Sequence, residues 1–176
     1  MIQKKTVSQV QSISLSLQGL VIGIVLVFPA LLSMDIGRVN FGFNFLPIAV
    51  IYYWPRAASY TWSLLCVFLL GLFYDMASAN TLGMWALAFL VLFMVLDGVP
   101  TVKKGFGRTI TGFTLSLLFC LVIVLLIGWI SMGKLPPVGT LLLNAIASVA
   151  IFPIIYWAYN AFNIIRGPSD VFGAHE

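Results

Sequence analysis

The charged residues of this chain are few and far apart, and Asp75 is one of the isolated ones. It is the only charged residue between Arg56 and Asp97. The single histidine is His175, next to the end of the chain, and no glutamate precedes Glu176. General acid–base catalysis and proton transport need ionisable side chains close to one another or to a substrate. The sequence has no Ser/His/Asp set, no paired carboxylates and no Gly-rich phosphate loop, so we expect a protein that is not an enzyme.

The two cysteines also give no sign of a reactive or metal-binding centre. Cys66 and Cys120 lie inside separate apolar runs. A zinc site or a disulfide framework requires several closely spaced ligands, which this sequence lacks. We therefore expect both cysteines to be packing residues, and we expect no metal and no cofactor.

Asp75 itself has two interpretations, and the sequence leaves both open. An ionisable residue at a membrane boundary is a candidate functional residue, here a docking point for a partner. Alternatively, its carboxylate accepts N–H bonds from the start of the next helix, where the helix dipole also favours a negative charge. Ser78, Asn80 and Thr81 are further candidates for capping that helix.

The composition places the whole chain in a membrane. Of 176 residues, 61% are hydrophobic and only 8% are charged, whereas a soluble domain carries about 25% charged residues. There is too little charge to cover a water-facing surface, so we predict one integral membrane domain over residues 1–176.

Six apolar segments are predicted to be membrane spans of an all-α bundle. They cover about residues 17–34, 41–54, 57–74, 82–96, 109–131 and 137–159. The second is short, because its residues would reach only about 21 Å along a helix, against a hydrocarbon core of about 30 Å. It either crosses a thinned region or is re-entrant.

The distribution of positive charge distinguishes these two topologies. With six spans and both termini in the cytoplasm, only Arg38 and Lys134 lie outside. Seven cations then lie inside, namely Lys4, Lys5, Arg56, Lys103, Lys104, Arg108 and Arg166. With a re-entrant second segment and the N-terminus inside, three cations lie inside and six outside. The positive-inside rule therefore favours six spans.

Ordered motifs in the second to fourth segments resemble the rod shape-determining protein MreD family. These motifs are Pro47, Tyr53-Trp54, the run Gly71-Leu72-Phe73-Tyr74-Asp75, and Leu82-Gly83-Met84-Trp85-Ala86-Leu87. Length, six spans and cytoplasmic termini also match, although the motifs cover only about 40 residues. One departure is that Pro55-Arg56 directly follows Trp54, where the family often has a few more residues before its proline.

The resemblance implies a non-enzymatic scaffold of the cell-elongation machinery in the bacterial inner membrane. Such proteins associate with MreC, and through it with MreB filaments, RodA and a penicillin-binding transpeptidase that build sidewall peptidoglycan. The family fold is similar to the substrate-binding subunits of energy-coupling-factor vitamin transporters, which implies a groove for a partner helix or a lipid. The candidate partner-binding or structural residues are Pro47, Trp54, Gly71, Leu72, Asp75, Gly83, Gly19 and Gly23.

The same fold similarity provides the alternative, a vitamin-binding transporter subunit. Such subunits commonly carry small residues at AxxxA spacing in the first span, where this chain has Gly19 and Gly23. That GxxxG pair would let another helix approach closely in either case. A vitamin site also needs converging polar groups, and the outer loops offer little beyond Asp75, Asn80 and Asn44. The missing acid–base set argues against a third class, the lipid-modifying enzymes.

Overall fold

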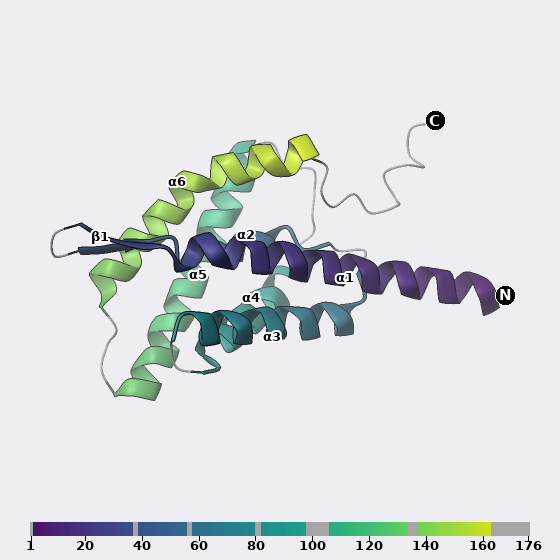
Figure 1. Cartoon of the computed structure of the whole chain (residues 1–176), viewed down its shortest axis with the longest axis horizontal. Helices are drawn as coiled ribbons and strands as arrows, with labels where there is room; N and C mark the ends of the chain where they lie inside the picture. The colour runs from purple at the N-terminus through teal and green to yellow at the C-terminus, as the bar shows by residue number, and fades with distance from the viewer. Residues whose placement is uncertain are drawn as a thin grey trace.

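The computed structural model describes residues 2–36, 39–55, 58–79, 82–97, 106–133 and 137–162. These residues form six helices and one short β-hairpin (Figure 1). The helices are α1 (Ile2–Leu31), α2 (Pro47–Tyr52), α3 (Tyr60–Ala77), α4 (Met84–Asp97), α5 (Phe106–Met132) and α6 (Val138–Phe162). The antiparallel hairpin of β1 (Ser33–Ile36) and β2 (Val39–Gly42) joins α1 to α2.

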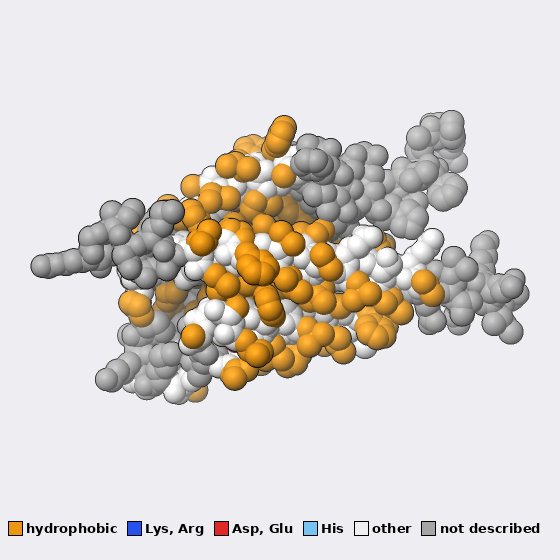
Figure 2. Space-filling model, viewed as in Figure 1, with side chains coloured by type: hydrophobic (Ala, Val, Ile, Leu, Met, Phe, Trp, Pro, Cys, Tyr) orange, Lys and Arg blue, Asp and Glu red, His pale blue; other side chains and the backbone are white. Residues whose placement is uncertain are grey.

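Among the described residues, four helices are long and apolar enough to cross a membrane, which indicates a multi-pass membrane protein by length and composition. The qualifying stretches are Val10–Leu31, Tyr60–Ala77, Phe106–Ser131 and Val138–Ala158. Helix α4 is equally apolar but has only 14 residues. Large hydrophobic side chains cover the outer surface instead of being confined to the interior (Figure 2). This is the surface expected of a bundle that has lipid as its solvent.

Helices α1 and α3 lie side by side and run in the same direction (Figure 1). The Ser16 and Ser63 hydroxyls are hydrogen-bonded at 3.2 Å, and these residues are 47 positions apart. Gly23 faces Leu70, a pair with the same separation further along both helices. Because both contacting pairs have the same sequence separation, α1 and α3 run parallel. The chain between them must therefore return from the end of α1 to the start of α3.

The predicted second span does not form one helix over residues 41–54. Instead β2 ends at Gly42, a turn follows, and α2 has only six residues. Pro47 is the first residue of α2, because proline has no N–H to donate and suits the first helical turn. All of Pro47–Ile51 is buried, and α2 contacts α1, α4 and α5. A short helix that is apolar on every side is stable only inside a bundle.

The other predicted spans have moved boundaries. Helix α1 is continuous with the polar N-terminal segment and ends at Leu31, where the hairpin begins. Helix α3 starts and ends three residues later than predicted, so Asp75 lies within its last turn rather than beyond its end. Helix α5 begins three residues earlier than predicted, and α6 extends three residues further.

Aromatic rings fill much of the interior. Trp85 and Tyr74 are in edge contact at a centroid distance of 5.0 Å, and Phe45 meets Trp85 at 5.4 Å. A second group joins α5 to α6 through the stacked rings of Phe113 and Phe152, with centroids 3.9 Å apart. Aromatic pairs of this kind add roughly 0.5–1.5 kcal/mol beyond area burial.

Candidate functional site

The Asp75 carboxylate is buried and caps the start of α4. Its Oδ2 accepts the N–H groups of Gly83 at 2.9 Å and Ala86 at 3.3 Å, and its Oδ1 accepts the N–H of Trp85 at 3.0 Å. These are among the N–H groups that a helix leaves without an internal partner at its first turn. The side chain is fully buried. This arrangement matches the second interpretation of Asp75, in which its carboxylate caps the next helix. The carboxylate and the helix dipole stabilise each other there.

The turn between α3 and α4 brings those N–H groups to Asp75. Gly83 has φ +94°, a left-handed conformation that residues with a Cβ rarely adopt. Ala79 also has a positive φ, at +50°. The Ser78 hydroxyl donates to the Tyr74 carbonyl at 2.6 Å, within the last turn of α3. The other two predicted caps, Asn80 and Thr81, lie outside the described residues.

Gly71 allows α3 and α4 to touch through their backbones. A Cβ on Gly71 would lie 2.8 Å from the Ala86 nitrogen, closer than real Cβ contacts come. Helix α3 packs antiparallel to α4 through the turn that Asp75 organises. Gly71, Asp75, Gly83 and Ala86 therefore form one unit, the α3–α4 turn unit.

Two polar side chains hold the non-helical return between α1 and α3. The Tyr74 hydroxyl donates to the Asn44 carbonyl at 2.8 Å, and the Gly42 N–H donates to Asn144 Oδ1 at 2.8 Å. Irregular backbone at membrane depth is tolerated only where protein supplies its hydrogen-bond partners. The Ser148 hydroxyl donates to the Asn144 carbonyl within α6, whereas the Asn144 amide links α6 to β2.

The predicted GxxxG pair of α1 is used inside the chain. A Cβ on Gly19 would meet the Trp54 ring at 3.0 Å, and one on Gly23 would meet Leu70 Cδ2 at 2.7 Å. The helix that approaches this pair is thus α3 of the same chain, and Trp54 packs beside it. Trp54 is only 4% exposed, and its Nε1 has no hydrogen-bond partner among the described residues.

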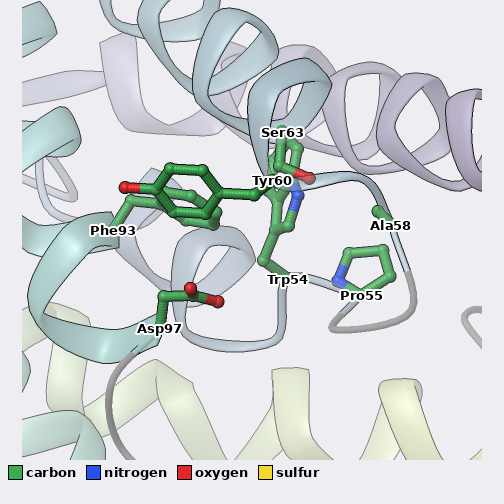
Figure 3. Close-up of a pocket in the computed structure, with 7 residues that line it drawn as sticks. All are labelled: Trp54, Pro55, Ala58, Tyr60, Ser63, Phe93 and Asp97. Carbon is green, nitrogen blue, oxygen red and sulfur yellow. The ribbon is translucent and has the colours of Figure 1, made fainter.

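A cavity of about 150 Å³ opens beside Trp54, where α3 begins and α4 ends (Figure 3). Its lining residues are Trp54, Pro55, Ala58, Tyr60, Ser63, Phe93 and Asp97. Phe93 meets the Trp54 ring edge-on at 6.1 Å and stacks with Tyr60 at 6.0 Å. Trp54, Ser63 and Phe93 form a buried floor, while Tyr60 and Asp97 are exposed at the rim.

The structure divides the predicted site residues between two places. Gly71, Asp75 and Gly83 meet in the α3–α4 turn unit, with Leu72 partly exposed beside them. Trp54 and Gly19 meet at the opposite end of α3, next to the cavity. Pro47 begins the central helix α2, and Gly23 lies between the two sites.

Sequence reasoning missed the partners of these residues. Tyr74 was noted only as part of a motif, and Phe93 and Asp97 were not connected with Trp54. The spacing of Phe93 and Asp97 was the available signal, because residues four apart share one face of a helix. Their proximity to Trp54 depends on tertiary packing and has no signal in the local sequence.

Among the described residues, no group of three or more His, Cys, Asp or Glu side chains is placed to hold a metal ion. No family model, curated protein or solved structure matches the chain.

Proposed function

We propose that the protein is a non-catalytic membrane scaffold of the MreD kind, which binds MreC in the inner membrane of a rod-shaped bacterium. Through MreC it would support MreB filaments, RodA and the penicillin-binding transpeptidase during sidewall synthesis. The proposal rests mainly on one observation: motif residues that are separate in the sequence contact one another in the structure. Gly71, Asp75 and Gly83 build one turn, and the other motif residues, Pro47 and Trp54, begin and follow the central helix.

The parallel arrangement of α1 and α3 supports six crossings with both termini in the cytoplasm. If residues 41–54 were re-entrant, α1 and α3 would cross in opposite directions. They run in the same direction. This supports a return of the intervening chain across the membrane through β2, the buried helix α2 and the connection to Tyr60. Charge counting and packing thus favour the same topology.

The outward side of the α3–α4 turn unit is the best candidate for the MreC contact. Met76 and Leu82 are 72% and 71% exposed, and Phe73 lies one turn earlier on α3. The polar atoms of Asp75 face inward and are already bonded. A partner transmembrane helix would therefore meet an apolar surface whose shape Asp75 maintains, and would not contact the carboxylate itself.

The vitamin-transporter alternative has less support from the geometry. Sites that enclose a small molecule usually hold about 300–1,000 Å³, whereas the cavity beside Trp54 holds about 150 Å³. Stacked and edge-on rings occupy the centre of the bundle. A vitamin retained after purification from native membranes would favour the transporter function.

Depletion in the native cell tests the proposal. Rod-shaped cells should become round as the protein is lost, and tagged protein should co-purify with MreC. Unchanged cell shape after complete depletion would exclude the proposed function. A matched test is Met76→Glu, which places a charge on the exposed surface without touching the Asp75 bonds. It should reduce co-purification with MreC while the folded amount stays normal.

A further inference from the structure

Helix α1 has two faces with different surroundings. The face that carries Ser16, Gly19 and Gly23 packs against α3 and Trp54. The opposite face is exposed along the candidate span Val10–Leu31. On it, exposed residues follow one another at alternating spacings of three and four positions. This outer stripe consists of Gln11, Ser14, Gln18, Val21, Val25 and Phe28.

Three residues of the outer stripe are polar and uncharged, and Gln18 lies deepest of them in the span. It is the ninth residue counted from Val10, which places it about 12 Å along the helix from the start of the span. Its amide has no hydrogen-bond partner among the described residues. Lipid tails offer neither donors nor acceptors, so a polar side chain at this depth is costly unless a neighbouring helix bonds it.

The spacing of the outer stripe is that of a packed pair of helices. Alternating steps of three and four residues are the a and d positions of a heptad repeat, which face one partner helix that crosses at about 20°. Gln18 and Val25 are seven residues apart and share one of these positions, and Val21 holds the other position between them. The GxxxG pair lies on the other face and already contacts α3 and Trp54, so a further helix would pack on the outer stripe.

The chemistry of the outer stripe favours a second copy of this chain as the partner. Two copies inserted in the same orientation place their α1 helices parallel, so that each residue of the stripe meets its own counterpart. The stripe contains no charged residue, and this self-pairing therefore brings no like charges together. A glutamine amide has both donors and an acceptor, so two Gln18 side chains related by a two-fold axis can each donate to the other. A polar residue at one such position also fixes the register of the pair.

We infer that the protein forms a parallel dimer through the outer stripes of two α1 helices, with the two Gln18 amides hydrogen-bonded to each other in the interface. This surface goes beyond the proposed scaffold function and uses none of the residues of the α3–α4 turn unit. Dimerisation of the purified protein is therefore independent of MreC.

Disulfide cross-linking of the purified full-length protein in lipid vesicles tests the interface. In a background without Cys66 and Cys120, Val21→Cys and Val25→Cys should form covalent dimers on mild oxidation. The physical reason is that facing positions of a parallel helix pair lie close enough for a disulfide. Ile146→Cys on α6 is the matched control, because Ile146 is 67% exposed but lies outside the stripe, and this variant should stay monomeric.

Replacing the amide tests the hydrogen-bonded pair. Gln18→Leu should weaken dimerisation in detergent about threefold to tenfold, as expected for the loss of hydrogen bonds between membrane helices. Sedimentation equilibrium measures this change. Because Gln18 is exposed and bonds no other described residue, the variant should melt at the wild-type temperature.

Failure of both stripe cysteines to cross-link, or equal cross-linking of Ile146→Cys, would overturn the dimer. Unchanged dimerisation of Gln18→Leu would overturn the hydrogen-bonded pair. If the stripe cysteines became linked to a different protein in native membranes while the purified chain stayed monomeric, the assignment of a second copy would be wrong.

Discussion

The carboxylate of Asp75 accepts the backbone N–H of Trp85 at 3.0 Å, and so the end of one membrane helix caps the beginning of the next. Two further N–H groups complete the cap. Because this carboxylate is buried and its oxygens are occupied, its role is to fix the turn. Under the proposed scaffold function, a partner would recognise the apolar surface around it.

Replacing Asp75 should lower the free energy of unfolding, and the loss should grow with the number of hydrogen-bond acceptor oxygens removed. Asp75→Ala leaves three N–H groups unpaired, and a hydrogen bond to a charged group contributes about 1.5–3 kcal/mol net. We expect a large fall in the folded amount and in the melting temperature in detergent. Asp75→Asn keeps one acceptor oxygen and should lie between Ala and wild type.

A suitable control for Asp75 is Ser148→Ala, which removes one hydroxyl bond to a carbonyl of its own helix and should cost about 1 kcal/mol or less. If Asp75→Ala retained wild-type abundance, melting temperature and MreC binding, the capping role would be wrong.

Adding a methyl group to Gly71 should separate α3 from α4. The new Cβ would meet backbone of Ala86, which cannot rotate away, and overpacking of this kind costs about 1–3 kcal/mol. Gly23→Ala should cost less, because the atom it meets is the flexible end of Leu70. Gly139→Ala is the matched control, since nothing lies within 4 Å of its Cβ. Thermal unfolding in detergent should rank Gly71→Ala as the least stable of the three.

Removing the Asn144 amide should loosen the return between α1 and α3. Asn144→Leu keeps a similar volume but leaves the Gly42 N–H without its acceptor, at a cost of about 1–3 kcal/mol. Tyr74→Phe should have a similar effect on the Asn44 carbonyl. Hydrogen exchange at residues 42–46 should become faster in both variants, and wild-type protection there would contradict the assignment.

Cysteine labelling can test the six crossings. Arg38→Cys and Arg56→Cys, made in a background without Cys66 and Cys120, should react with impermeant reagents from opposite sides of the membrane. A reporter fused after Lys134 should behave as periplasmic. Labelling of both positions from the same side, or a cytoplasmic signal after Lys134, would exclude this topology.

Some features were predictable because they depend on local composition. The membrane environment follows from the scarcity of charge, and α3, α5 and α6 were located within about three residues because a long apolar run in lipid must satisfy its backbone internally. The capping role of Asp75 was one of two open interpretations, because a carboxylate before a turn is a local signal for a helix start.

Residues 41–54 show what local reasoning could not provide. Apolar residues 41–54 satisfied the pattern of a span, yet they form the end of a hairpin, a turn and six residues of helix. Burial of α2 against α1, α4 and α5 stabilises that geometry, and the distant residues Tyr74 and Asn144 bond its backbone.

The sequence by itself therefore determined a multi-pass membrane chain with an isolated carboxylate shortly before a helix start, and it left the role of that carboxylate open. Only the tertiary structure decided that Gly19 and Gly23 serve internal packing, and that Trp54, Phe93 and Asp97 share a cavity. The physical reason is that composition and periodicity show which segments are apolar enough to lie in lipid. Close backbone approaches and converging side chains depend on which segments become neighbours, and no short stretch of sequence contains that information.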